Sequence, residues 1–250
     1  MALNAEIRKT LKHFRLDVAF SCEKGRILSI VGPSGSGKTT ILRIIAGLAD
    51  ADEEMIRCGG RAWADTRAGI RLPVQRRGVS MVFQDFTLFP HVSVYRNVCF
   101  ASRDKHLPRE LMKSFGIWHL RDSSPRRISG GERQRAAICQ ALAREPVALL
   151  MDEPFSALDP STRRQLRMAV ADMKGRLNIP IIHVTHDIRE ALFLGDEILP
   201  VVEGKICHKW LLQFMLTARE AGLCSRRDAL DGEGEVELEP YDTRRRYSRE

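Results

Sequence analysis

The feature that most constrains this chain is a glycine-rich turn between an apolar segment and a helical one. Residues 32–39 read Gly-Pro-Ser-Gly-Ser-Gly-Lys-Thr, which fits the pattern G-x-x-x-x-G-K-[ST]. Ile27 to Val31 predicts a buried strand before the turn, and a helix is expected from Lys38 to about Ala49. Because such a turn points backbone N–H groups at phosphate oxygens, and the helix dipole assists, this context favours nucleotide binding over an ordinary Gly/Ser turn.

Apolar runs of strand length alternate with helical patterns along the rest of the chain. This alternation is typical of a parallel sheet with crossover helices. Two segments depart from it: 50–80 predicts short antiparallel strands and loops, and 90–127 predicts an inserted helical subdomain. The further strands are expected at 81–83, 147–151, 181–185 and 197–202, and the further helices at about 129–146 and 160–180.

The strand expected at 147–151 leads directly into two carboxylates. Asp152 is the candidate Mg²⁺ ligand, through water, and Glu153 is the candidate base or positioner for an attacking water. A solvated strand end is the alternative for two such acids. Lys38, which would reach the β and γ phosphates, and Thr39, whose hydroxyl would bind Mg²⁺, favour the functional reading.

Two further strand ends carry polar side chains. Gln84 follows the strand at 81–83 and is a candidate contact to Mg²⁺ or water, with ordinary surface polarity as the alternative. His186 follows the strand at 181–185 and is a candidate hydrogen-bond donor to a γ-phosphate, with a capped, hydrogen-bonded structural histidine as the alternative. His183 is interpreted as structural, because no third ligand converges with the two histidines on a metal.

The charge leaves several partners open. The chain of 250 residues has 40 Lys plus Arg against 32 Asp plus Glu, a net charge of +8 that suits nucleic acid, anionic lipid or phosphate ligands. No apolar run approaches the roughly 20 residues that cross a bilayer. Residues 1–13 lack the continuous apolar stretch of a signal peptide, so a cytoplasmic location is expected.

The motif Ile128-Ser129-Gly130-Gly131-Glu132-Arg133-Gln134-Arg135 resembles the signature of ABC ATPases, the nucleotide-binding subunits of ABC transporters. The segments 156–159 and 185–187 resemble the D-loop and the switch histidine of the same family, and all the motifs occur in the family's order between about residues 25 and 204. The predicted fold is therefore α/β, a phosphate-loop (RecA-like) parallel-sheet core with an N-terminal antiparallel β subdomain and an inserted α-helical subdomain at about 90–135.

The resemblance implies that ATP and Mg²⁺ bind between two copies of the chain arranged head to tail. Each ATP would lie between the phosphate loop of one copy and Ser129 and Gly131 of the other, while Asp159 bridges the copies. Glu153, His186 and Gln84 are the predicted catalytic residues, and Thr39, Gln84 and Asp152 the predicted metal ligands. The predicted nucleotide-binding residues are Gly32, Pro33, Ser34, Gly35, Ser36, Gly37, Lys38, Thr39, Thr40, Ser129, Gly130, Gly131, Asp159 and, as the candidate that stacks on adenine, Phe14 or its neighbour His13.

Within the family, the segments 69–73 and 83–98 resemble the importers of oxyanions such as molybdate or tungstate. The apolar stretch 86–100 is where such a subunit would receive a short helix of a membrane permease, with subdomain core as the alternative. Residues 1–204 are the predicted ATPase domain and 205–250 a C-terminal helix and charged tail, too short for the β domain that senses ligand in some relatives. The helix is expected to pack on the core or on a partner copy, with a lipid surface as the alternative.

The favoured function is an ATPase subunit at the cytoplasmic face of the cell membrane, peripheral to it. It would power uptake of a solute through a separate permease, served indirectly by an extracytoplasmic solute-binding protein, and would bind no nucleic acid. The alternative is a soluble ATPase of DNA repair or chromosome maintenance, which the basic charge suggests. That class needs long coiled-coil heptads or C-x-x-C pairs within the core, and the sequence has neither.

Overall fold

The computed structural model describes residues 2–84, 88–156 and 158–220, and its strands form one mixed sheet of 11. One half is antiparallel, and buried apolar residues alternate with exposed ones along its strands, as in β1, where Leu3, Ala5 and Ile7 are buried. The antiparallel half consists of β1 (Ala2–Thr10), β2 (Arg15–Glu23), β4 (Glu53–Cys58), β5 (Arg61–Asp65) and β6 (Ile70–Arg71), and the short β11 (Lys205–Ile206) pairs with β2 and with β10.

The other half is parallel and carries the candidate site at one edge. Its strands lie in the order β10-β3-β9-β8-β7, and most are buried along their whole length because helices cover both faces. The parallel strands are β3 (Ile27–Val31), β7 (Val79–Val82), β8 (Ala148–Asp152), β9 (Ile181–Thr185) and β10 (Glu197–Val202). The loops that follow β3, β7, β8 and β9 therefore meet at one edge, where ligands of such sheets bind.

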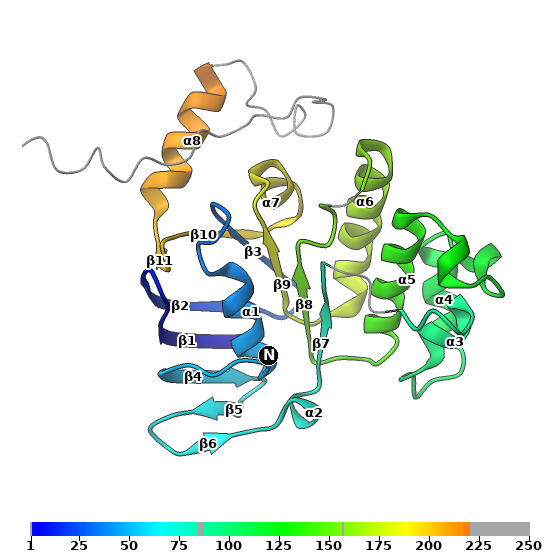
Figure 1. Cartoon of the computed structure of the whole chain (residues 1–250), viewed down its shortest axis with the longest axis horizontal. Helices are drawn as coiled ribbons and strands as arrows, with labels where there is room; N and C mark the ends of the chain where they lie inside the picture. The colour runs from blue at the N-terminus through cyan, green and yellow to red at the C-terminus, as the bar shows by residue number, and fades with distance from the viewer. Residues whose placement is uncertain (1, 85–87, 157, 221–250) are drawn as a thin grey trace, which may run out of the picture.

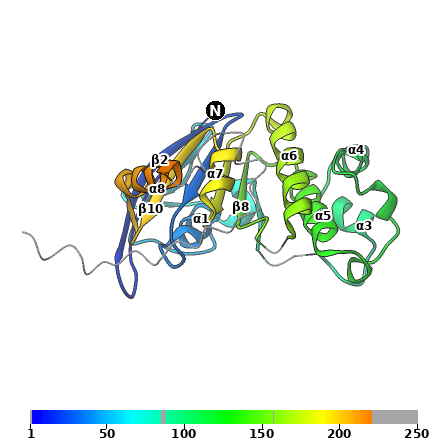
Figure 2. The ribbon, with the colours of Figure 1, turned by 90° about the horizontal axis from the view of Figure 1, so that it is seen from above.

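The parallel sheet separates the two larger hydrophobic cores of the described residues, and helices pack on both of its faces. Helix α1 (Lys38–Ala46) buries Ile41, Leu42, Ile44 and Ile45 between the antiparallel strands and the parallel sheet. The helices on the opposite side, around a second core, are α3 (Val94–Cys99), α4 (Leu107–Ser114), α5 (Gly130–Leu142) and α6 (Pro160–Leu177), with single turns at Trp118–Leu120 and Pro125–Arg127. Figure 1 shows the antiparallel strands and the helices α3 to α5 at opposite sides of the parallel strands, and Figure 2 places α3 and α4 farthest out.

Several element boundaries differ from the expected ones for local reasons. Helix α1 ends at Ala46 rather than near Ala49, because Gly47 adopts the left-handed conformation, with φ 80°, that closes helices. The segment 50–80 contains a short helix, α2 (Val74–Arg77), that is too brief to give a helical period. Strand β7 begins at Val79, earlier than the 81–83 expected, since the buried polar Ser80 breaks the apolar run.

The last described helix packs on the parallel half. Helix α8 (His208–Glu220) buries Trp210 against Val31 and against Ile188 of α7 (Ile188–Leu194), and Leu211 and Phe214 pack on the same cluster. Helix α8 therefore contacts the core on this face, as expected of a packed helix. The charged tail expected at its C-terminal side lies outside the described residues. Within the described ranges, none of the helices combines the length and hydropathy that crossing a bilayer requires.

Candidate functional site

The glycine-rich loop after β3 has the backbone shape of a phosphate cradle. Gly35 and Gly37 have φ of 79° and 100°, which glycine adopts without steric cost. Gly32 packs against β10 so closely that a Cβ there would lie 1.9 Å from the carbonyl oxygen of Val201. The N–H of Gly204 also donates to the carbonyl of Ser36 at 3.1 Å. The loop is thus pinned to the β10–β11 turn.

Lys38, the first residue of α1, folds back over this loop. Its Nζ donates to the carbonyls of Gly32 at 2.7 Å and Pro33 at 2.8 Å, and the side chain is buried. Burial lowers the pKa of Lys38, while the negative charges of Glu153 and Asp152 oppose this shift. The ammonium therefore stands at the loop's centre, where phosphate oxygens would replace the two carbonyls as acceptors.

Thr39 and Asp152 place two oxygens side by side. The Thr39 hydroxyl donates to Oδ1 of Asp152 at 3.0 Å, across the gap between α1 and the end of β8. Burial raises the pKa of Asp152 and the neighbouring charge of Glu153 adds to the effect, while the Thr39 hydrogen bond opposes it. A hydroxyl and a carboxylate are oxygen donors of the kind that Mg²⁺ prefers, so Thr39 and Asp152 would fit a magnesium site.

Glu153 and His186 form a second side-chain pair at this edge. Glu153 has φ 46°, a conformation uncommon for a residue with a side chain, and its N–H donates to the carbonyl of Val184 on β9 at 2.9 Å. Its Oε2 lies 2.8 Å from Nδ1 of His186, whose side chain is 52% exposed. The carboxylate at the end of β8 and the imidazole after β9 are therefore in direct contact.

Gln84 lies at the same edge as these groups. Val82, the last residue of β7, pairs with Met151 of β8, so Gln84 follows β7 at the edge where β8 ends at Asp152 and Glu153 follows it. Its side chain is exposed, and the next three residues, 85–87, lie outside the described ranges. The backbone therefore brings Gln84 to the site's edge.

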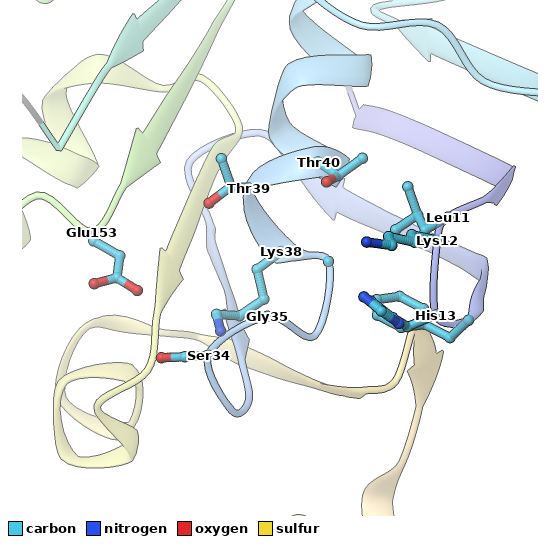
Figure 3. Close-up of a pocket in the computed structure, with 11 residues that line it drawn as sticks. Leu11, Lys12, His13, Ser34, Gly35, Lys38, Thr39, Thr40 and Glu153 are labelled. Atoms are coloured by element: carbon cyan, nitrogen blue, oxygen red, sulfur yellow. The ribbon is translucent and has the colours of Figure 1, made fainter.

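A pocket of about 410 Å³ opens between the loop and the tip of the β1–β2 hairpin. Ser34, Gly35, Gly37, Thr39 and Thr40 line one wall, together with Lys38 and Glu153. Lys12 and His13 stand on the opposite wall (Figure 3) beside Leu11 and Phe14. Sequence reasoning missed Leu11 and Lys12. The sequence signal for them is the position of residues 11–14 at the tip of a hairpin, between two strands of alternating apolar residues. These residues come to lie opposite the glycine-rich loop only when the hairpin folds.

Phe14 lines this pocket with a ring that packs on glycines. A Cβ on Gly204 would lie 2.6 Å from the Phe14 ring and one on Gly37 would lie 3.4 Å from it. The ring is therefore held between the loop and the β10–β11 turn. His13 is exposed beside it and faces the pocket (Figure 3).

Ser129, Gly130 and Gly131 begin α5 and do not line this pocket. The Ser129 hydroxyl caps the helix by accepting from the N–H of Glu132 at 3.3 Å, and Glu132 accepts in return from the N–H of Ser129 at 2.8 Å. Ser129 itself is exposed. The Ser129 hydroxyl also donates to Oε2 of Glu132 at 2.8 Å. The start of α5 is thus an exposed helix N-terminus, which favours an anion.

Asp159 stands at the start of the neighbouring helix. Its carboxylate accepts from the N–H of Thr162 at 3.0 Å and so caps α6. Helices α5 and α6 run side by side in the same direction, because Gly131 contacts Thr162 and, one turn on, Arg135 donates to Gln165 at 2.7 Å. Asp159 and the signature segment therefore lie at the same end of the helix pair, away from the pocket's lining.

Replacing Gly131 by Ala is expected to destabilise the chain, because the added Cβ would lie 2.2 Å from Cγ2 of Thr162. Overpacking of this kind costs about 1–3 kcal/mol, or roughly 2–10 °C in melting temperature for a chain of this size. Thermal unfolding of Gly130→Ala is the matched control, since its Cβ meets only the Arg133 side chain at 4.0 Å. Equal melting temperatures for the two variants would contradict the close packing of α5 on α6.

Comparisons with known proteins agree with this geometry. The sequence model of the family described as ABC transporter matches residues 16–156. A molybdate/tungstate import ATP-binding protein of Archaeoglobus fulgidus is 40% identical over 88% of this chain and 91% of that protein. A molybdenum import ATP-binding protein of Paramagnetospirillum magneticum is 38% identical over 86% of this chain, and a sulfate/thiosulfate import ATP-binding protein of Agrobacterium fabrum is 41% identical over 79%.

The chain spans only 60% of the length of each of the last two relatives. Among solved structures, the ADP conformation of an ATP-binding cassette of an ABC transporter aligns with a TM-score of 0.73 and 22% identity. This alignment covers 93% of this chain and 100% of that one, which confirms the predicted α/β fold. The chain therefore belongs to the ABC transporter family, as one of its ATP-binding cassettes.

Proposed function

We propose that the chain is the ATP-hydrolysing subunit of an import system, and that it drives a separate membrane permease. The observation that carries the proposal is the meeting of Lys38, the Thr39–Asp152 pair and the Glu153–His186 pair at one edge of the sheet. A magnesium nucleotide is held by groups of this kind, namely a glycine-rich loop, a lysine, a hydroxyl and a carboxylate. Relatives that are import subunits do not favour the alternative of a DNA-repair ATPase.

The roles of the side chains follow from their positions. Lys38 would exchange its two backbone acceptors for oxygens of the β and γ phosphates, and Thr39 and Asp152 would hold Mg²⁺, which offsets the phosphate charge. Glu153 would accept the proton of the attacking water, and His186 would hold the Glu153 carboxylate and donate toward the γ-phosphate. Gln84 would contact the metal or this water from the end of β7.

Two copies of the chain would complete each site. Ser129, Gly130 and Gly131 form an anion-binding helix start that does not line the pocket of their own chain. A partner copy arranged head to tail would bring this start onto the γ-phosphate, and Asp159 would lie near the contact between copies. One phosphate loop and one signature segment per chain support this arrangement.

The permease would dock on an aromatic platform made of Phe89 and Phe100. These two rings are 43% and 69% exposed, and their centroids lie 4.7 Å apart. The buried Asn97 fixes the platform, because its amide donates to the carbonyls of Phe89 and Val92 and accepts from the N–H of Phe89 at 2.7 Å. An exposed aromatic pair on rigid backbone, close in sequence to Gln84, suits a helix of a membrane protein.

Replacing Phe100 by Ser is expected to weaken the assembly with the permease about tenfold or more, because an exposed aromatic anchor is lost. The measurement is co-purification of the permease from membranes that contain both subunits. Leu48→Ser is the control, because it removes an apolar side chain that is 50% exposed and lies just after α1. If the two variants retain the permease equally, the platform is not the docking surface.

The solute would be a tetrahedral oxyanion of the molybdate, tungstate or sulfate class. Relatives named for these solutes support this class. A spermidine/putrescine import ATP-binding protein of Bacteroides thetaiotaomicron is also 40% identical, over 76% of this chain, so the cassette alone does not decide the solute. The test is to isolate the permease with its binding protein and to measure uptake of molybdate, tungstate, sulfate and spermidine. Spermidine uptake without oxyanion uptake would overturn the assignment.

A further inference from the structure

A chain of three buried polar side chains lies behind the catalytic edge. Ser29 on β3, His183 on β9 and Glu190 on α7 are each at most 3% exposed. The Ser29 hydroxyl lies 3.1 Å from Nδ1 of His183, and Nε2 of His183 lies 2.8 Å from Oε1 of Glu190. Both ring nitrogens of His183 therefore have partners, on two different elements.

Such a network is unusual in a parallel sheet whose buried side chains are mostly apolar. Burying polar groups costs free energy even when they are hydrogen-bonded, and apolar side chains of similar volume often stabilise a core as well or better. A directional hydrogen bond supplies orientation, which apolar packing does not. The His183 ring also packs edge-on against Phe155, which follows Glu153 by two residues; the ring centroids lie 5.8 Å apart. The network thus contacts the segments that carry both members of the Glu153–His186 pair.

The connection to His186 runs through the start of α7. His186 precedes Asp187, whose carboxylate caps α7 by accepting from the N–H groups of Arg189 and Glu190 at 2.8 and 3.3 Å. The N–H of Asp187 donates to the Thr185 hydroxyl at 3.0 Å. Glu190 lies in the first turn of this helix, so its bond to His183 ties the turn beside His186 to β9.

We propose that His183 and Glu190 are positioning residues for ATP hydrolysis: they hold the first turn of α7 so that His186 stays on the Glu153 carboxylate. This inference rests on the proposed function and deepens it. Neither residue lines the pocket, so neither contacts nucleotide. The effect of losing them falls on the rate of the chemical step and not on the affinity for ATP.

The first experiment compares kcat and KM for ATP in purified His183→Phe and Glu190→Met, because neither replacement can form the bond between these two side chains. Each variant is expected to lower kcat about tenfold, because a catalytic group displaced by 1 Å can cost up to ~10²-fold in rate. The KM for ATP should stay within about twofold of that of the unmodified chain. His183→Gln, whose amide nitrogen replaces Nε2 as the donor to Glu190, is expected to recover most of the rate. Ile182→Val, a buried neighbour on β9, is the control for lost packing.

A double-mutant cycle with His186→Ala gives the sharper readout. If His183 acts through His186, adding His183→Phe to His186→Ala lowers kcat no further, whereas independent effects would multiply. Multiplying effects, or a kcat of His183→Phe no lower than that of Ile182→Val, would overturn the inference. The proposed function fails separately, namely if the unmodified chain with its permease hydrolyses no ATP.

Discussion

Glu153→Gln is expected to lower steady-state ATP hydrolysis by about 10²–10⁴-fold while leaving ATP binding intact, because the amide accepts no proton from water. The change preserves the shape of the side chain next to His186 and removes its negative charge and its basicity. The measurement is release of phosphate under saturating Mg²⁺-ATP, with nucleotide affinity determined by equilibrium titration.

The matched control is Glu145→Gln. Glu145 also has a positive φ, 52°, but it follows α5 at the opposite end of β8 from Asp152 and lies outside the pocket lining. This variant has the same charge change and should hydrolyse ATP at the unmodified rate. Hydrolysis by Glu153→Gln at more than about a tenth of the unmodified rate would remove Glu153 from the role of base.

Lys38→Ala is expected to weaken ATP binding by roughly 30- to 150-fold, about 2–3 kcal/mol for lost charged hydrogen bonds. The buried ammonium is the cation at the centre of the loop, and Gly32 and Pro33 accept its hydrogen bonds in the absence of phosphate. Because Ala also empties buried volume, Lys38→Met separates the loss of charge from the loss of packing. Both variants should bind ATP equally weakly.

Lys24→Ala is the charge-matched control, because Lys24 is exposed and lies outside the pocket lining. Its affinity for ATP should equal that of the unmodified chain. Isothermal titration of ATP into these variants thus shows whether the loss of affinity comes from the position of Lys38 or from the change in net charge. An affinity of Lys38→Met within about threefold of the Lys24 variant would contradict the phosphate-loop assignment.

The central strands of the fold could be predicted from the sequence because their burial leaves little ambiguity. Strands β3, β9 and β10 have the expected bounds, since each is an apolar run ended by a turn or a cap. The two-residue β11 and the four-residue α2 could not be predicted, because neither is long enough to show a period. Both depend on contacts with distant segments, as where Arg77 of α2 donates to the carbonyls of Ile44 and Ile45.

The candidate site was predictable where motif and strand end coincide. Lys38, Thr39 and Asp152 were assigned together, and the structure places Thr39 and Asp152 in contact. The partner of Glu190 was not predictable. Asp187 and Glu190 have the spacing of a reciprocal cap, and Asp187 does cap α7, but the Glu190 carboxylate bonds to His183 on β9 instead. A tertiary contact thus replaced the local one.

The central claim is that two copies of this chain enclose ATP between the loop of one and the start of α5 of the other. Sedimentation of Glu153→Gln with Mg²⁺-ATP tests it most directly, because slow hydrolysis preserves the complex. A dimer that holds two ATP molecules is expected, and a monomer when Ser129→Arg is added to block the helix start. A Glu153→Gln chain that is saturated with ATP yet sediments as a monomer would contradict it.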